Sequence, residues 1–499
     1  MLHKGAKTRF LLRRMTKAID ICFSIRQGDP LAMILYILYA EPLLVYIERR
    51  ITGLSIENFS QKLEAYCDDM NIITTKMSDL IVVDEAVEMF EEVSGAILSR
   101  NLKCKIMGFG SWKNKHQWPL KYLQTVSEIK VFGFYFMNSY RGLLKKNWDY
   151  RYQKFEQAIL SWSSRRLGYL KQRVEVIKTF AYSRIYYVAS VLPMSKALCK
   201  KFERTVGKFI WNSSGRVLRI ALDDMKLPPR RGGLSLPCIY TMSFSLQLSQ
   251  VLRLLNSSDD KSLAHLWYWI GECISDFCLH LPVQTHAANV PCYFDSLAQN
   301  ITNARLTEIL STSNWKRVTN QMIYRANVEL FPAPRVEQES QFSFKQTWKN
   351  LGLIAHSSSV HEVLLLLIHD KLPTSERLFR IQLQQDPYCS FCLEHCGLAV
   401  IADREHYFCS CHRVSAMWED LKKRLRIMLK NVDVNQHIRI LTLNLPSVKE
   451  AVWLISNFIH EIWVSSSDHS STEQLFGFLK FKYRNEKDYL QLGEIPGFD

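Results

Sequence analysis

The chain has 499 residues, 47% of them hydrophobic, and a formal net charge of +16. A chain of this length and composition can bury large cores, so we expect roughly three folded domains. No apolar run reaches the ~18 residues that a membrane span needs, because Glu41 and Pro42 interrupt the longest candidate, residues 31–47.

The N-terminal segment, "MLHKGAKTRFLLRR", contains no cleavable hydrophobic signal, so we expect an intracellular protein. A transit peptide is the alternative, because the first 18 residues are basic and free of acid.

Residues 30–50 predict the first helix. Pro30 suits a first helical turn, and the residues after it are apolar on most faces, which is typical of a buried helix. We expect residues 26–30 to form a loop before this helix, where Gly28 permits close approach of a ligand to the backbone.

Two adjacent carboxylates, Asp68 and Asp69, interrupt the segment "EAYCDDMNIITT" at residues 64–75. Side chains alternate across a strand, so two neighbouring Asp can share one metal site only at a turn. Apolar and β-branched residues on both sides predict a hairpin with the pair at its tip. An ordinary solvated turn is the alternative that these residues leave open.

Two further elements follow the hairpin. Residues 78–96 predict an amphipathic helix with Ser78 as its N-cap and Gly95 as its stop. The segment "IKVFGFYF" at residues 129–136 predicts a strand.

Basic residues are concentrated in the middle of the chain. Residues 101–230 carry 26 Lys and Arg against 7 Asp and Glu, a net charge of +19. Residues 148–211 within this block read as helical, and their aromatic residues offer bases a stacking surface beside cations for phosphates, as nucleic acids require. The alternative is a solvated helical face with core aromatics. The aromatic residues concerned are Trp148, Trp162, Tyr169, Tyr182, Tyr186, Tyr187 and Trp211.

The segment "LPPRRGGLSLP" at residues 227–237 predicts a domain boundary, because Pro and Gly punctuate structure. Residues 238–360 read as mostly helical, with polar loops at 256–261 and 332–341.

Five of the thirteen cysteines cluster at residues 389–411. In an intracellular chain, such a cluster favours a metal over disulfides. Cys389 and Cys392 form C-x2-C, and His406 and Cys411 form H-x4-C, a spacing that suits tetrahedral zinc in a structural site. Reduced cysteines in a helical domain are the alternative. Spare ligands that could substitute are His395, Cys396, Cys409 and His412, with Cys409 the nearest rival.

We expect a small core around this zinc site. Its members would be Leu383, Tyr388, Phe391, Tyr407, Phe408 and Trp418.

The order of motifs closely resembles that of non-LTR (LINE-type) retrotransposon reverse transcriptases. "RQGDPL", "AYCDD", "VSGAILSRNLKCKI" and "VFGFYF" are similar to motifs B, C, D and E of that family. The resemblance covers residues 20–237, including a thumb-like region, and residues 371–418, where "KLPTSERLFR" precedes the cysteines.

The resemblance implies an α+β fold and a domain layout. Residues 1–137 would be a partial right-hand polymerase palm with an antiparallel sheet, residues 138–237 a basic helical thumb and residues 238–370 a helical connector. Residues 371–420 would be the zinc-binding module and residues 421–499 a helical tail.

The resemblance also implies the chemistry, an RNA-directed DNA polymerase working by target-primed reverse transcription. Asp68 and Asp69 would bind Mg²⁺ or Mn²⁺, and Lys103, with Lys105 as rival, would give a proton to pyrophosphate. The partners would be template RNA, target DNA and deoxynucleotides, without a membrane, in a nuclear or cytoplasmic ribonucleoprotein. The implied nucleotide, template and primer contacts are Arg26, Gln27, Gly28, Tyr66, Cys67, Phe132 and Gly133.

The motif A carboxylate of this family has no clear counterpart. Asp20 is the sole acid before Arg26 and sits six residues before the motif B loop, so we interpret it as incidental. We therefore expect an N-terminally truncated element that binds RNA and zinc without extending a primer. The alternatives are a catalytically inactive remnant that holds nucleic acid, and a structural zinc protein without a nucleic-acid role.

Overall fold

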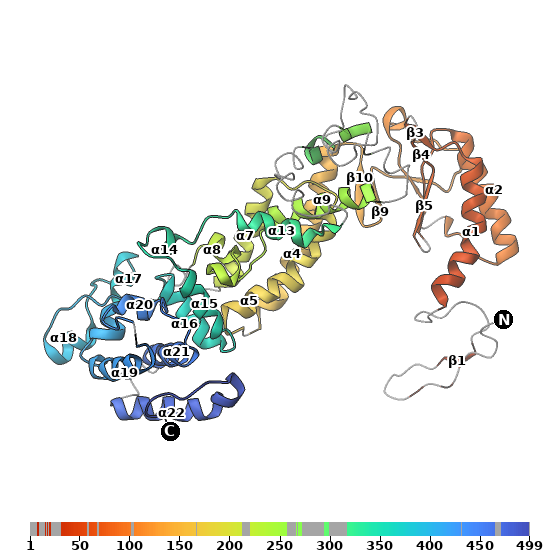
Figure 1. The fold of residues 1–499 in the computed structure, drawn as a ribbon. Helices are drawn as coiled ribbons and strands as arrows, with labels where there is room; N and C mark the ends of the chain where they lie inside the picture. Colours follow the sequence, from red (N-terminus) through yellow and green to blue (C-terminus); the bar gives the residue numbers. More distant parts are fainter. Residues whose placement is uncertain are drawn as a thin grey trace. The chain divides into compact units, whose positions relative to one another are not determined.

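The computed structural model describes most of the chain, and Figure 1 shows its elements in order. Two compact units result, the first comprising residues 1–149 and 253–295, the second residues 150–252 and 296–499. The described residues are 7–8, 15, 17, 19–20, 31–56, 59–66, 69–100, 104–165, 167–211, 220–256, 266, 268–271, 294–298, 317–430, 432–464 and 471–498.

The first unit combines helices with short two-stranded ladders, so the α+β class is confirmed. Within the described residues the strands pair two by two and form no single sheet, and the palm fold stays a prediction. The antiparallel pairs are β1 (Lys7–Thr8) with β2 (Ile19–Asp20), β3 (Leu54–Ile56) with β4 (Phe59–Gln61), β5 (Leu63–Tyr66) with β6 (Asp69–Ile72), and β9 (Glu128–Val131) with β10 (Phe134–Met137). A parallel pair joins β7 (Lys105–Ile106) to β8 (Gln124–Thr125), and a short 3-10 turn, η1, spans Gly110–Trp112.

Two helices lie side by side in this unit, α1 (Ala32–Arg50) and α2 (Met77–Ser94) (Figure 1). Ile47, Ile51 and Ala86 form their buried centre, and apolar residues of β5 and β6 pack against it. Burying each isoleucine contributes about 2 kcal/mol. This core holds the β5–β6 hairpin against the helix pair.

The prediction that the first helix is buried is wrong for its N-terminal half. Met33, Ile34, Ile37 and Leu38 are each more than half exposed. The apolar pattern correctly predicts a helix, but α2 and β5 reach chiefly its C-terminal turns, where Ile47 is fully buried.

The boundaries of α2 differ partly from the prediction. Gly95 ends the helix in the left-handed conformation, with φ of 71°, as expected. Ser78 is not the N-cap, because the helix begins one residue earlier and Lys76 occupies the capping position. The Thr74 hydroxyl accepts the Lys76 N–H and donates to Asp79, so a residue outside the helix organises its start.

The single strand predicted at residues 129–136 is in fact a hairpin. Phe132 and Gly133 have φ of 47° and 83°, so the chain reverses within two residues. Two positive φ angles match the tight turn that joins antiparallel strands, and glycine adopts this conformation without strain. The continuous apolar pattern concealed the turn.

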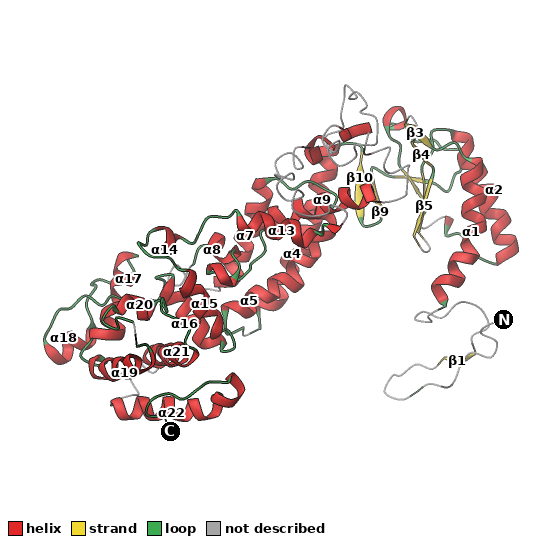
Figure 2. Ribbon diagram, viewed as in Figure 1, coloured by secondary structure: helices red, strands yellow, loops and turns green. Residues whose placement is uncertain are grey.

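The second unit is largely helical (Figure 2). Two helices contain residues of both units. The first 10 residues of α4 (Tyr140–Ser163) belong to the first unit and the rest to the second, and α9 (Ile239–Asn256) belongs to the second unit up to Leu252. The other elements are α5 (Leu170–Val176), η2 (Ile177–Tyr182), α6 (Ser183–Ala189), α7 (Lys196–Trp211), α8 (Leu222–Lys226), η3 (Pro229–Arg231), α13 (Asn320–Glu329), α14 (Arg335–Gln338), α15 (Lys345–Leu353), α16 (Ser358–Ile368), α17 (Ser375–Arg380), α18 (Ser390–Cys396), η6 (His406–Ser410), α19 (Ser415–Met428), α20 (His437–Leu441), α21 (Lys449–Val464) and α22 (Thr472–Leu490).

The core of this unit is built on α16 and α21, which are buried along most of their length. A long-range hydrogen bond ties α5 to α16, since the Leu170 N–H donates to the Glu362 carboxylate at 2.8 Å. Helices from the predicted thumb and from the predicted connector therefore share one compact unit.

The Gly-rich segment at residues 227–237 also lies inside this unit. Arg231 donates to the carbonyl oxygens of Val328 and Glu329, and the carbonyl of Gly232 lies 2.8 Å from His369 Nε2. These contacts bind the segment to α13 and to the end of α16.

No helix in the portion of the chain that the structure describes is long and apolar enough to cross a membrane.

Candidate functional site

The hairpin predicted around the two carboxylates is confirmed by the pairing of β5 with β6. Tyr66 ends β5 and lies opposite Asp69, the first residue of β6. Asp69 is exposed, and the two residues between the strands, Cys67 and Asp68, lie outside the described residues. The Mg²⁺ site therefore stays a prediction.

Other predicted polymerase residues also fall outside the described part of the chain. These are Arg26, Gln27, Gly28 and Lys103. The rival Lys105 is described, begins β7 and is exposed.

The β5–β6 and β9–β10 hairpins meet through two aromatic rings. Tyr66 and Phe132 lie edge to face, with ring centroids 6.3 Å apart and planes at 79°. Both rings also face solvent, Tyr66 being 69% and Phe132 36% exposed. Two residues that the resemblance assigns to the primer end are thus neighbours, although 65 residues separate them in the chain.

A buried asparagine of α4 fixes the second hairpin, a role that sequence reasoning missed. Asn147 accepts the Tyr135 N–H at 2.9 Å and donates to the Tyr135 carbonyl at 2.7 Å and the Leu143 carbonyl at 2.9 Å. Without the Asn147 side chain, the backbone N–H and carbonyl of Tyr135 would lose these hydrogen bonds, which costs stability when polar groups are buried. No sequence motif links Tyr135 to Asn147, so only the fold reveals this contact.

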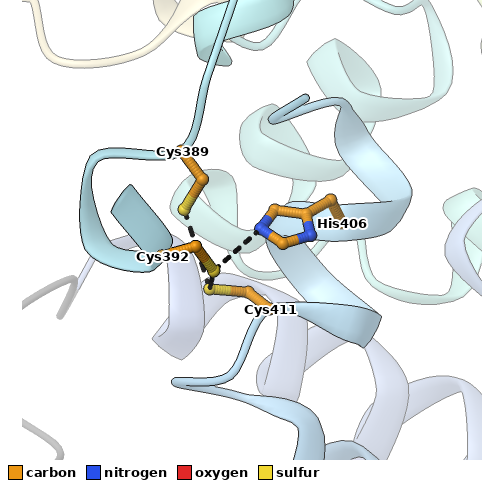
Figure 3. Close-up of side chains that lie close together, drawn as sticks. All are labelled: Cys389, Cys392, His406 and Cys411. Carbon is orange, nitrogen blue, oxygen red and sulfur yellow. Dashed lines mark hydrogen bonds between the residues drawn. The ribbon is translucent and has the colours of Figure 1, made fainter. Parts of the chain in front are cut away.

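The four predicted zinc ligands come together in the second unit. Figure 3 shows the side chains of Cys389, Cys392, His406 and Cys411 facing one another, and their ligand atoms all lie within 4.8 Å. All four residues are buried. The Sγ atoms of Cys389 and Cys392 lie 3.8 Å and 3.7 Å from Cys411 Sγ, and Cys392 Sγ lies 3.4 Å from His406 Nε2.

These distances fit a tetrahedral zinc ion. Bond lengths of about 2.3 Å to sulfur and about 2.0 Å to nitrogen place two sulfurs about 3.8 Å apart and sulfur and nitrogen about 3.5 Å apart. A disulfide would need about 2.05 Å between sulfurs. The Cys3His group can therefore hold a metal such as zinc, with no position left for a substrate.

Local backbone structure explains how the ligands converge. Cys389 is the N-cap of α18, and its N–H donates to the Val400 carbonyl where the chain returns after Gly397, whose φ is 65°. His406 begins η6, and the Cys411 N–H closes on the His406 carbonyl at 2.8 Å. Two tight turns thus bring the four ligands together.

The protonation of the group depends on the ion. Burial raises the pKa of Cys411 to about 12, opposed by a backbone hydrogen bond from Arg413, and burial lowers the pKa of His406. A divalent cation reverses the effect on the thiol, because metal-bound cysteine is deprotonated. The Asp403 carboxylate accepts the backbone N–H of His406 at 2.7 Å and so fixes the backbone that carries this ligand, a contact that its position in the sequence did not reveal.

The spare ligands lie outside the group. Cys396 and His412 are exposed, His395 stacks on Phe391, and Cys409 is buried but contributes no atom to the cluster.

The core expected around the zinc site is only partly formed. Phe408 and Trp418 are buried as predicted, whereas Leu383 and Tyr388 are exposed. Tyr388 forms a single β-bridge with Ile401, which is also exposed.

Several aromatic residues of the basic block belong to the core. Trp148, Tyr182 and Trp211 are buried, which supports the alternative reading for these three, while Tyr187 is half exposed. Cations flank other rings, with Arg165 over Trp162 at 4.2 Å. The surface available for stacking is therefore smaller than the sequence suggested.

Comparison with known proteins gives one partial relationship. No family model matches the chain. Over 238 residues, 46% of its length, the chain is 25% identical to a Xenopus laevis protein described as transposon TX1 uncharacterized 149 kDa protein. The aligned part spans 18% of that protein. The chain is thus similar to part of a protein from a transposon.

Proposed function

We propose that this chain carries the primer-binding and catalytic-motif part of a non-LTR retrotransposon reverse transcriptase. The substrates would be template RNA, a primer end at target DNA and deoxynucleotides. The similarity to a transposon protein supports the transposon origin, and the ordered motifs B to E support the polymerase.

The contact between Tyr66 and Phe132 is the observation that carries the proposal. It joins the hairpin containing the two Asp to the hairpin assigned to the primer grip. Partly exposed rings at this junction offer a face to the last primer base, since base stacking on aromatic side chains tolerates any sequence. Asp69 lies directly across the ladder from Tyr66, so a primer end held there would lie beside Asp69.

The predicted carboxylates have the chemistry that the reaction needs. Adjacent Asp oxygens suit hard cations such as Mg²⁺ or Mn²⁺, which supply charge stabilisation for phosphoryl transfer. In this proposal Asp68 and Asp69 hold the metal, Arg26, Gln27, Gly28 and Cys67 contact template or nucleotide, and Gly133 shapes the primer grip. Lys103 would donate a proton to pyrophosphate.

The Cys3His module has a separate role in this proposal. Four protein ligands close its tetrahedron, so zinc there would stabilise the fold and position nearby surfaces rather than catalyse a reaction.

A second candidate function is nucleic-acid binding without polymerisation. The net charge of +19 across residues 101–230 favours it, because phosphate binding needs no catalytic carboxylates. Within residues 1–499, no clear third carboxylate accompanies Asp68 and Asp69.

Primer binding tests the proposal with a matched pair of variants. Phe132→Ala removes the ring at the junction, whereas Phe136→Ala removes an exposed ring further along the same hairpin. We expect Phe132→Ala to weaken binding of an RNA template annealed to a DNA primer about tenfold and Phe136→Ala to leave it unchanged. Equal effects of the two variants would contradict the primer-end assignment.

Primer extension tests whether residues 1–499 can polymerise by themselves. With Mg²⁺ and deoxynucleotides, we expect residues 1–499 to bind the primer–template without extending it. Robust extension that Asp68→Ala abolishes would show that this chain supplies every catalytic carboxylate.

A further inference from the structure

A polar hollow of about 430 Å³ lies beside the Cys3His group. Its position is notable because Glu405, one of the lining residues, directly precedes the metal-ligand candidate His406. The other lining residues are Gln341, Phe342, Asn435, Gln436, His437, Ile438 and Arg439.

One wall of the hollow is an aromatic ring held in place from behind. Phe342 is half-buried and stacks on Phe344, with centroids 5.3 Å apart and planes at 4°. Phe344 is itself buried, so the stack is fixed to the core. A flat, supported ring of this kind provides a face for an aromatic ligand.

The polar groups of the hollow come chiefly from α20 and the turn before it. Arg439 is exposed and offers a planar guanidinium, which matches the geometry of phosphate oxygens. Asn435 and Gln341 add carboxamides, which both donate and accept hydrogen bonds.

Two further lining residues, His437 and Glu405, are held by contacts that reach the metal-ligand segment. His437 Nδ1 lies 2.9 Å from the Glu405 carboxylate, and its ring meets Trp418 edge to face at 5.5 Å. Trp418 is buried, so His437 and Glu405 are anchored on two sides. The hollow is thus preorganised before a ligand arrives.

From these groups we infer that the hollow binds one unpaired nucleotide of a single-stranded nucleic acid. The base stacks on Phe342, its polar edge meets the carboxamides, and the phosphate pairs with Arg439. The volume is within the range of small-ligand sites, and the positive charge of the Arg439 guanidinium favours a ligand that carries a phosphate over a neutral aromatic ligand. This inference rests on the proposed nucleic-acid function and adds a second binding site, distinct from the primer-end hairpins.

Fluorescence anisotropy with end-labelled 12-nucleotide probes tests the site in the full chain. The probes are single-stranded RNA, single-stranded DNA and a blunt duplex of the same sequence. Phe342→Ala and Arg439→Ala remove the stacking ring and the guanidinium. Phe379→Ala and Arg426→Ala are matched controls, because both are exposed and neither lines the hollow.

We expect each hollow variant to weaken single-strand binding about tenfold, since one stacked base or one phosphate contact contributes that much. The controls should change it less than about twofold, and duplex binding should be the same in all variants. The defect of Arg439→Ala should shrink at high salt, whereas that of Phe342→Ala should persist. A loss with both RNA and DNA identifies base and phosphate as the ligand, and a loss with RNA alone adds the ribose 2′-hydroxyl.

Unchanged single-strand affinity in both hollow variants, or an equal loss of duplex binding, would overturn the inference. Its failure is distinguishable from that of the proposed function. If Phe132→Ala weakens primer–template binding but Phe342→Ala and Arg439→Ala leave single-strand binding unchanged, only the nucleotide site is refuted. If the wild-type chain binds no nucleic acid, both proposals are refuted. Unchanged zinc content and melting temperature establish that each variant is folded.

Discussion

The Cys3His module and the paired hairpins differ in how far apart their residues lie in sequence. The four ligand candidates fall within 23 residues, and two tight turns bring their atoms within 4.8 Å. Tyr66 and Phe132 come from separate hairpins and meet only because helices hold both. A site built from one short segment is specified locally, whereas a site built from several segments depends on the whole unit.

The largest expected effect removes a ligand from the local site. Cys389→Ser should abolish zinc binding and unfold the module, because structural zinc in a small site contributes about 10 kcal/mol of binding free energy. Cys396→Ser is the matched control, since this exposed cysteine lies seven residues away and outside the cluster. Zinc counting by native mass spectrometry should give one ion in the control and none in Cys389→Ser. The reverse pattern would overturn the ligand assignment.

The next effect tests whether the Gly-rich segment is integral to the second unit. A Cβ at Gly233 would lie 2.0 Å from the Leu227 carbonyl oxygen, a backbone atom that cannot move aside cheaply. Gly233→Ala should therefore lower the free energy of unfolding by about 3 kcal/mol or more. At Gly352, in the last turn of α15, an added Cβ would meet nothing within 4 Å, so Gly352→Ala should be neutral or stabilising by up to about 1 kcal/mol. Similar urea midpoints for the two variants would show that residues 227–237 are a loose linker.

Acid should weaken the contact between His369 and the Gly232 carbonyl in the same segment. Burial chiefly lowers the pKa of His369 to about 4, while its hydrogen bond with the Gly232 carbonyl acts in the opposite direction. The folded protein thus resists protonation below the unfolded pKa of about 6.5, and up to about 3 kcal/mol of stability is lost as pH falls from 6.5 to 4. His369→Gln keeps an N–H donor without titrating, so its unfolding free energy should depend less on pH in this window. An unchanged pH slope would exclude His369 and would point to another buried histidine, such as His361, whose pKa burial also lowers to about 4.

The smallest effect concerns the non-local site. Asn147→Ala removes two hydrogen bonds that fix β10 to α4 and a third within α4, and should destabilise the first unit by about 2 kcal/mol. Primer–template binding should weaken with it, because Phe132 would lose its position relative to Tyr66. Asn114→Ala changes an exposed residue of the same unit and should alter neither quantity. Normal primer binding by a destabilised Asn147→Ala would show that the hairpin contact is not needed.

The features that the sequence predicts correctly are those whose residues lie close together in the chain. Ligand spacing predicted the Cys3His group, and the apolar flanks predicted the β5–β6 hairpin. The same patterns failed where tertiary contacts decide. The exposure of Ile34 and Leu38, the turn at Phe132 and the burial of Trp148 in a basic segment all depend on what packs against them. The role of Asn147 could not be predicted at all, because an isolated asparagine in a helical pattern carries no signal of its partner.

Photo-cross-linking from the primer terminus tests the central claim most directly. A DNA primer with a photoreactive base at its 3′ end, annealed to template RNA, is irradiated with the full chain, and the adduct is mapped by peptide mass spectrometry. The account predicts cross-links to Tyr66 and Phe132, lost when the photoreactive base is moved ten nucleotides from the end. A terminal base that cross-links instead to the second unit would contradict the assignment of the two hairpins as the primer-end site.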